Sequence, residues 1–204
     1  MNISIRKVAN AVEFFSDKSK LEEAVLAVRN SFGREDMDFG DIYSHLTSPE
    51  TLLLFQNESQ RILGIASYNN DVLSGIPALI VEGIALDPQI QANGIFKKAT
   101  DFVLGKNGIV CLRTQSSHMY RALAGYCTQV YPGQANMPKA IEAIHEDLAN
   151  KLGCNADGNG VVKGFYGGLM YGKKPFHPET NYFLEQKLGM NIEKGDALLV
   201  VGIK

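Results

Sequence analysis

Residues 78–104 read ALIVEGIALDPQIQANGIFKKATDFVL, and this stretch decides the fold. It begins as an apolar run rich in β-branched residues, which predicts a strand over Ala78–Ala85. A polar loop, Gln89–Asn93, follows the strand, and Gly94 ends that loop. The apolar spacing after Gly94 is typical of an amphipathic helix. Four residues are expected on the buried side of this helix: Ile95, Ala99, Phe102 and Val103.

A strand that leads through a glycine-containing loop into a helix is an arrangement suited to phosphate binding. The first N–H groups of a helix have no partner within it, and the helix dipole favours an anion at that end. Gly94 would let the backbone approach a phosphate closely, because glycine has no side chain to block it. Lys97 or Lys98 would add positive charge. The alternative is an ordinary helix start.

The same residues resemble the central motif of the GNAT acetyltransferases, a family that holds acetyl-CoA by its pyrophosphate in such a turn. The family motif reads Gln/Arg-x-x-Gly-x-Gly/Ala, and its six positions are filled here by Gln91, Ala92, Asn93, Gly94, Ile95 and Phe96. The resemblance implies that these six residues bind the cofactor. Phe96 replaces the last small residue of the motif, and one interpretation is that its ring points into the core instead.

The order of the expected elements agrees with the resemblance. The pattern predicts a strand, two helices, two strands, the strand and helix of the central stretch, then another strand and helix. This is the order of the GNAT core, so the sequence predicts an α/β fold of the GNAT (acyl-CoA N-acyltransferase) type, with helices flanking a mixed, mostly antiparallel central sheet. The strands outside the central stretch are expected at Asn2–Val8, Thr51–Gln56, Ile62–Tyr68 and Gly108–Arg113.

The two helices before Thr51 have recognisable boundaries. Ser19 and Glu22 have the spacing of a capping box, and Gly33 is expected to end that helix. The second helix is expected over Asp41–Leu46. In the GNAT fold these helices cover the substrate side.

The second half of the chain is expected to complete the core within a single domain, 1–204. We interpret residues 132–178 as an insertion with a helix that starts at Pro138. Strands are predicted at Val161–Tyr166 and Ala197–Ile203, and a short helix is predicted at Pro178–Leu188. The glycine-rich segment 164–172, GFYGGLMYG, is either a ligand-facing loop or an ordinary turn.

Glu82 lies inside the apolar central strand and is the candidate general base. Burial raises the pKa of a carboxylate, which would suit a base that deprotonates an ammonium group near neutral pH. The resemblance implies the same role, because the family often has a glutamate on this strand. Since side chains alternate between the two faces of a strand, an outward-facing carboxylate is the alternative.

Three residues after Gly83 are candidates to hold the thioester through their backbone: Ile84, Ala85 and Leu86. A β-bulge there would leave N–H groups unpaired, and one of them could donate to the thioester carbonyl as an oxyanion hole. An unbroken strand is the alternative. The resemblance also implies a tyrosine general acid in the helix after Gly108–Arg113, but Leu123 occupies its usual position. Tyr120 is the candidate in its place, with Tyr126 or water as alternatives.

Composition excludes several classes of function. The net charge of −2 comes without a basic stripe, so no nucleic-acid partner is expected. No apolar run approaches the ~18 residues that a membrane span needs, and the N-terminus lacks an apolar signal core, so we expect a cytoplasmic protein with no membrane partner. The three cysteines form no CxxC pair, and the His145-Glu146 and Asn155–Gly160 segments lack the remaining ligands of zinc and calcium motifs, so no metal is expected.

Together these features predict an N-acetyltransferase that moves an acetyl or other short acyl group from acetyl-CoA, its co-substrate, to a primary amine. Transfer is expected by direct attack in a ternary complex, and the acceptor is a small molecule or a peptide. The alternative is a non-catalytic acyl-CoA-binding sensor or partner module, for which Phe96 and Leu123 are the reasons. The apolar closing strand makes a homodimer one expectation.

Overall fold

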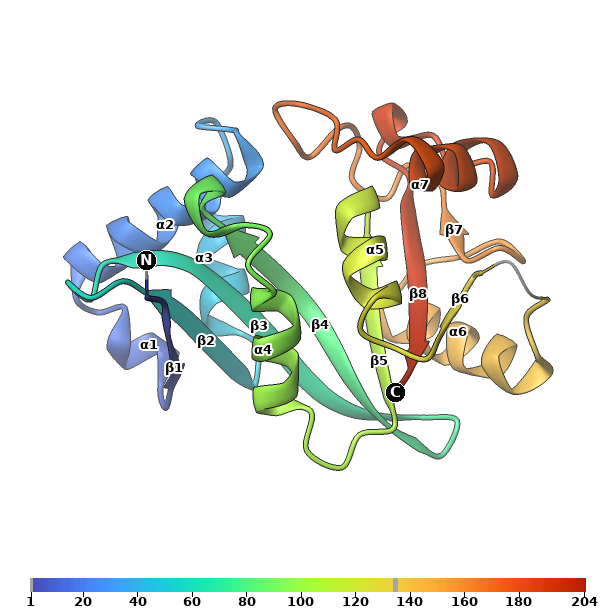
Figure 1. The fold of residues 1–204 in the computed structure, drawn as a ribbon, viewed down its shortest axis with the longest axis horizontal. Helices are drawn as coiled ribbons and strands as arrows, with labels where there is room; N and C mark the ends of the chain where they lie inside the picture. Colours follow the sequence, from blue (N-terminus) through green and yellow to red (C-terminus); the bar gives the residue numbers. More distant parts are fainter. Residues whose placement is uncertain (1, 134–135) are drawn as a thin grey trace. The chain divides into compact units, whose positions relative to one another are not determined.

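The computed structural model describes residues 2–133 and 136–204, and the chain falls into two compact units (Figure 1). The first unit contains Met1–Asn70 and Val81–Gly105, and the second contains Asp71–Ile80 and Lys106–Lys204. Two long strands, β3 (Ile62–Leu73) and β4 (Ile76–Leu86), run through both units. Each unit therefore contains part of the same hairpin.

The first unit has the strand order β1-β2-β3-β4. Strand β1 (Ser4–Val8) pairs antiparallel with β2 (Thr51–Gln56), and β2 pairs antiparallel with β3 so that Leu53 lies opposite Ala66. All residues of β2 are buried, as its nearly continuous apolar sequence predicts. The strands predicted at Thr51–Gln56 and Ile62–Tyr68 are confirmed, and β3 continues five residues further.

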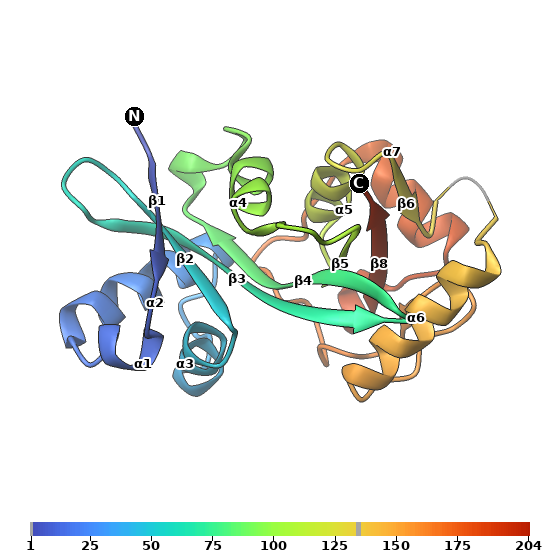
Figure 2. The same cartoon turned by 90° about the horizontal axis from the view of Figure 1, so that it is seen from below.

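Three helices cover one face of this part of the sheet: α1 (Ala11–Phe14), α2 (Lys18–Phe32) and α3 (Phe39–Thr47) (Figure 2). Their apolar residues form one core with β1, β2 and β3. Gly33 ends α2 in the left-handed conformation, as predicted, with φ of 63°. The predicted capping box is wrong, because Asp17 accepts from the Ser19 N–H at 3.0 Å and starts the helix at Lys18.

Helix α4 (Ile95–Val103) lies on the opposite face of the first unit from α2 (Figure 2). Its buried residues are Ile95, Phe96, Ala99 and Thr100. The prediction that Phe102 is buried is wrong, since 57 % of this residue is exposed. With 3.6 residues per turn, Phe102 lies about a quarter turn away from the centre of the buried face, in the last turn of a short helix.

The second unit has the strand order β4-β5-β8-β6. Strand β5 (Ile109–Thr114) pairs antiparallel with β8 (Ala197–Ile203), so that Cys111 lies opposite Val201. Two short strands pair with opposite ends of β8: β6 (Gln129–Tyr131) with its last residues and β7 (Val161–Val162) with its first. The sequence did not predict β6.

The strand predicted at Val161–Tyr166 is wrong beyond Val162, because the chain turns at Lys163. Gly164 and Gly167 have φ of 61° and 69°, which a regular strand does not allow. The Gly164 N–H donates to the Asp196 carboxylate at 2.9 Å instead of to a neighbouring strand. The two valines that predicted a strand are therefore followed by a turn, which the Asp196 carboxylate holds through its hydrogen bond to Gly164.

The helices of the second unit are α5 (Ser117–Ala124), α6 (Lys139–Lys151) and α7 (Pro178–Tyr182). Helix α6 packs its apolar side on β5 and β8, and confirms the helix expected from Pro138. A π-helical turn (Phe183–Lys187) continues α7, and a 3-10 turn (Ile192–Lys194) precedes β8. The predicted insertion, 132–178, includes residues 134 and 135, which lie outside the described residues.

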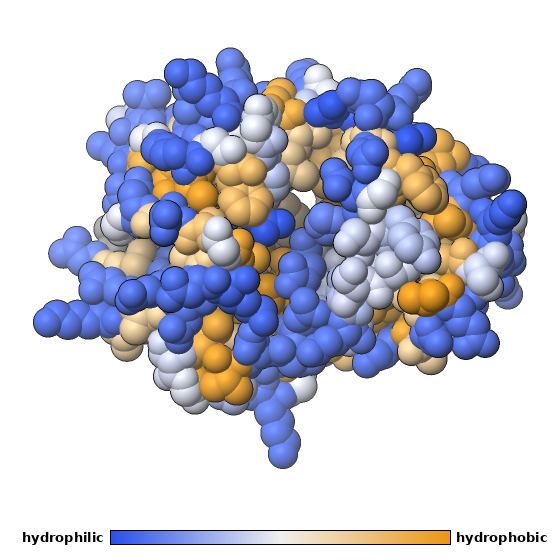
Figure 3. Space-filling model, turned by 180° about the vertical axis from the view of Figure 1, so that it is seen from behind, coloured by the Kyte–Doolittle hydropathy of each residue, from blue (hydrophilic) through white to orange (hydrophobic). Residues whose placement is uncertain are grey.

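These elements confirm the predicted fold class, α/β with helices flanking a mostly antiparallel sheet. No helix in residues 2–133 and 136–204 is long and apolar enough to cross a membrane. Figure 3 shows hydrophilic residues over most of the face it presents, with apolar residues in small separate areas.

Candidate active site

Glu82 lies in β4 and is half-buried. Asn69 of β3 donates its side-chain N–H to Glu82 Oε1 at 2.8 Å. The amide oxygen of Asn69 accepts from the backbone N–H of Glu50 at 2.8 Å. Because both ends of the Asn69 amide are bound, it holds the Glu82 carboxylate in one orientation. The sequence analysis missed Asn69, which no motif marks.

Strand β4 contains one more residue than β3 over the same length, and the register at its two ends shows it. Ser74 and Gly75 have φ of 48° and 79°, the signature of a two-residue type I′ turn, so Leu73 lies opposite Ile76. At the other end the Asp87 N–H donates to the Leu63 carbonyl at 2.8 Å. From these pairs, β3 advances ten residues while β4 advances eleven, which requires a β-bulge in β4.

The hydrogen bond between Asn69 and Glu82 locates the bulge. These two side chains share a face of the sheet only in the register set by the turn, because a slip of one residue moves a side chain to the other face. The extra residue of β4 therefore lies between Glu82 and Asp87. This interval includes the candidate thioester residues Ile84, Ala85 and Leu86.

The backbone around the bulge is tightly packed on one side. Gly64 of β3 is so close to β4 that a Cβ there would lie 2.7 Å from the Ala85 carbonyl oxygen. The Leu86 N–H donates to the Ser31 hydroxyl of α2 at 3.0 Å. Leu86 is thus already bound. The Ala85 N–H faces β3, because the Asp87 N–H bonds to Leu63 and residues two apart on an antiparallel strand point the same way. Ile84 therefore remains as the predicted thioester donor.

The turn predicted to hold the pyrophosphate is closed by its own side chains. Gln91 donates to the Leu86 carbonyl at 2.8 Å, and Asn93 donates to the Ile90 and Gln91 carbonyls at 3.3 Å and 3.1 Å. Ala92 and Gly94 are both left-handed, with φ of 61° and 67°. All four residues, Gln91–Gly94, are exposed. The turn is therefore both solvent-exposed and held in shape by its own side chains.

Helix α4 starts at this turn without a side-chain cap, since its N-cap residue is Gly94. An uncapped helix N-terminus at an exposed turn fits a bound phosphate, because an anion can accept from N–H groups at this end. Ile95 and Phe96 are buried. Phe96 is 8 % exposed, which agrees with the interpretation that its ring points into the core.

Tyr120 belongs to the second unit, in α5, and its hydroxyl is already bound. It donates to the Pro132 carbonyl at 2.8 Å, and the ring packs 5.7 Å from the Phe183 ring. Burial raises the pKa of Tyr120 to about 12. Tyr126 is also buried, with Lys204 Nζ 3.6 Å from the centre of its ring. The environment of Tyr120 therefore does not favour release of its phenol proton.

No protein-family model matches the chain, and no curated protein matches it. Among solved structures, it is similar to the ribosomal-protein-S18-alanine N-acetyltransferase of Escherichia coli, with a TM-score of 0.47, 11 % identity, and coverage of 99 % of this chain and 94 % of that one. It is similar to the diaminobutyrate acetyltransferase EctA of Paenibacillus lautus, with a TM-score of 0.45, 12 % identity, and coverage of 99 % and 95 %.

A third similar structure is the GCN5-related glucosamine N-acetyltransferase region of a fungal multi-domain β-N-acetylglucosaminidase. Its TM-score is 0.46 at 12 % identity, and the match covers 79 % of this chain but only 18 % of that one. These neighbours are acetyltransferases, as is the family that the central stretch resembles. The acceptors named for them belong to those enzymes.

Proposed function

We propose that the protein transfers an acetyl or other short acyl group from acetyl-CoA to a primary amine of a small molecule or peptide. One observation supports this most: Glu82, oriented by Asn69, directly precedes a bulge in β4. Strand β4 then leads into an uncapped helix. A base, an oxyanion site and an anion site follow one another along a single stretch of chain. Because β3 and β4 run through both units, we treat 1–204 as one domain.

The reaction needs three groups from this stretch. Glu82 accepts the proton of the amine, directly or through water, as the nitrogen attacks the thioester carbon. The backbone N–H of Ile84 donates to the carbonyl oxygen, where negative charge develops. The C–N bond forms and the C–S bond breaks. We assign protonation of the departing thiolate to water, because the Tyr120 hydroxyl is bound to Pro132.

The anchoring of the co-substrate falls to residues Gln91–Phe96. The left-handed residues Ala92 and Gly94 let the backbone lie close to a pyrophosphate. The N-terminus of α4 supplies its dipole, and the exposed Lys97 and Lys98 supply charge. Together the backbone of the turn, the helix dipole and the two lysines would bind the pyrophosphate without an extended basic surface.

The test compares Glu82→Gln with the wild type in CoA binding and in CoA release over a panel of primary amines. Glu22→Gln is the matched control, because Glu22 is exposed on α2. We expect unchanged CoA affinity and a loss of turnover of roughly 10²–10⁴ in Glu82→Gln. Unchanged turnover would remove Glu82 as the base. A wild type that binds CoA but releases none with any amine would favour the non-catalytic module, which Phe96 and Leu123 suggest.

A further inference from the structure

Two segments that resemble incomplete metal motifs, residues 145–146 and 155–160, contribute walls to one cavity of about 370 Å³. The first segment lies on α6, and the second is the loop between α6 and β7. Cavities of ~300–1,000 Å³ are typical of small-molecule sites. The walls of this cavity all belong to the second unit, so the site does not rest on the proposed acyl transfer.

His145 is a buried wall of this cavity, with 6 % of its surface exposed. Its Nε2 lies 3.3 Å from the Tyr131 carbonyl, which can only accept, so Nε2 carries the proton of the neutral ring. Nδ1 is therefore an acceptor, and among the described residues it has no hydrogen-bond partner. This edge of the ring lies against Gly160, another wall of the cavity, where a Cβ would be 3.0 Å from Nδ1. A buried acceptor needs a donor, and the cavity is where the fold leaves room for one.

Three carboxylates line the same cavity: Glu142 and Glu146 from α6, and Asp157 from the loop. The two glutamates are four residues apart on the same face of the helix, where like charges are destabilising. In the described parts of the chain none of the three forms an ion pair. Among the described residues that line the cavity there is no Lys or Arg. The cavity therefore has an excess of negative charge that a bound cation would neutralise.

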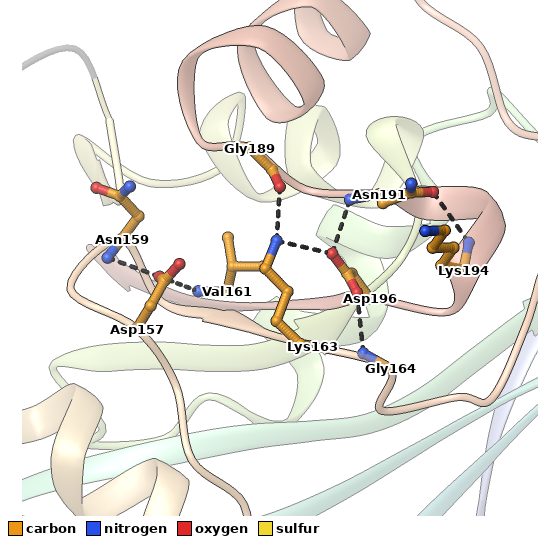
Figure 4. Close-up of polar contacts among 9 residues, drawn as sticks. All are labelled: Asp157, Asn159, Val161, Lys163, Gly164, Gly189, Asn191, Lys194 and Asp196. Carbon is orange, nitrogen blue, oxygen red and sulfur yellow. Dashed lines mark hydrogen bonds and ion pairs between the residues drawn. The ribbon is translucent and has the colours of Figure 1, made fainter.

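Asp157 is held in place by its own loop (Figure 4). Its Oδ1 accepts from the N–H groups of Asn159 and Val161, both at 2.9 Å. The Gly160 N–H donates to the Asp157 carbonyl at 2.8 Å, and the Leu199 N–H donates to the Gly160 carbonyl at 2.9 Å, which joins the loop to β8. The loop is therefore ordered, and these bonds leave the Oδ2 atom of Asp157 available to a ligand.

We propose that this cavity binds a small primary alkylammonium ion. One N–H of the ligand donates to His145 Nδ1, and the three carboxylates balance its charge. An ammonium group has three donors and no acceptor, which matches walls whose unpaired groups are acceptors. The alkyl part packs against Met137, Ala149 and Ala156, apolar walls that favour an organic cation over a bare metal ion.

The probe is n-butylammonium chloride, titrated into the full chain at pH 7.5, where His145 is neutral because burial lowers its pKa below 6.5. The ¹⁵N resonances of the imidazole, assigned with His145→Gln, report whether Nδ1 accepts a hydrogen bond. Tetramethylammonium keeps the charge but has no N–H, and n-butanol keeps the alkyl chain without the charge. A double variant, Glu142→Gln with Glu146→Gln, removes two of the carboxylates. Its matched control is Glu22→Gln with Glu179→Gln, which removes the same charge at exposed positions elsewhere.

We expect n-butylammonium to cause a saturable upfield shift of the His145 Nδ1 resonance, and tetramethylammonium and n-butanol to cause none. The variant without Glu142 and Glu146 should bind n-butylammonium roughly 3–10-fold more weakly, because two charge interactions are lost, and the control variant should bind it as the wild type does. An unchanged Nδ1 resonance, or an equal shift with tetramethylammonium, would overturn the donation to His145. Equal weakening in both double variants would overturn the acidic site, since the effect would then be one of net charge. CoA affinity should not change in either double variant.

Discussion

Asn69 and Glu82 are joined by a hydrogen bond of 2.8 Å between neighbouring strands, and the backbone N–H of Glu50 fixes the Asn69 amide. The pair lies directly before the extra residue of β4. Mutation of a side chain that orients a proposed base should lower the reaction rate, as mutation of the base itself does. The reason is that a misdirected carboxylate accepts a proton less well. This relationship leads to the first prediction.

Asn69→Ala should lower kcat by about tenfold or more while the affinity for CoA stays unchanged, because residues that hydrogen-bond and orient a functional group typically contribute ~10–100-fold. Steady-state kinetics with a fixed amine acceptor and a CoA-binding titration measure both quantities. Asn2→Ala is the control, since the exposed Asn2 side chain donates to Glu58. Equal kcat values for Asn69→Ala and the wild type would show that Glu82 needs no such support.

Acetyl-CoA and free CoA should stabilise the protein against heat, and ATP at the same concentration should not. A ligand at ~100 times its Kd adds about 2.7 kcal/mol to the free energy of unfolding. For a chain of 204 residues this corresponds to a rise in Tm of roughly 5–10 °C. A thermal shift assay with matched ligand concentrations measures it. An equal rise in Tm with ATP would mean that the turn before α4 recognises phosphate groups in general and does not distinguish CoA from ATP.

Gly64→Ala should destabilise the protein by roughly 1–3 kcal/mol, because the new Cβ would lie 2.7 Å from the Ala85 carbonyl oxygen. The backbone of β4 must then shift at the bulge, so turnover should fall as well. Gly108→Ala is the control, since a Cβ at Gly108 meets nothing within 4 Å and Gly108 has no positive φ. Denaturant unfolding of both variants gives the comparison, and equal midpoints would contradict the close approach.

The sequence predicts the parts of this fold that depend on local pattern. The boundaries of β2, the end of α2 at Gly33 and the start of α4 after Gly94 all follow from apolar runs and glycines. The features that the sequence does not predict depend on contacts between residues far apart in the chain. The turn at Lys163 requires Asp196, and the bound state of Tyr120 requires Pro132.

The residues of the candidate site likewise include some that the sequence marks and some that it does not. Glu82 and Gly94 stand out in the sequence, because a carboxylate in an apolar strand and a glycine before a helix are unusual. Asn69 does not stand out, since its role arises from the register between β3 and β4. His145 lies in an ordinary amphipathic helix, and only the fold brings its ring to the loop at Gly160.

The stability of the protein should fall as the pH drops through about 6.5, and His145 is one source of this dependence. His145 is 6 % exposed in α6, and its Nε2 faces the Tyr131 carbonyl at 3.3 Å. Among the described residues its Nδ1 has no hydrogen-bond partner. Burial lowers the pKa of His145 below its usual value of 6.5, although the Tyr131 carbonyl raises it.

A lowered folded-state pKa means that the unfolded chain binds a proton more readily than the folded chain. The stabilisation from neutral His145 is therefore complete above pH 6.5 and is lost as the pH falls toward the folded-state pKa, with a slope of at most about 1.4 kcal/mol per pH unit. Urea unfolding at pH 7.5 and 5.5 measures the slope. His145→Gln keeps an N–H for Tyr131 but cannot titrate, so its stability should change less between the two pH values. An equal change in both proteins would assign the dependence to other groups, of which Glu142, Glu146 and Asp157 line the same cavity of about 370 Å³.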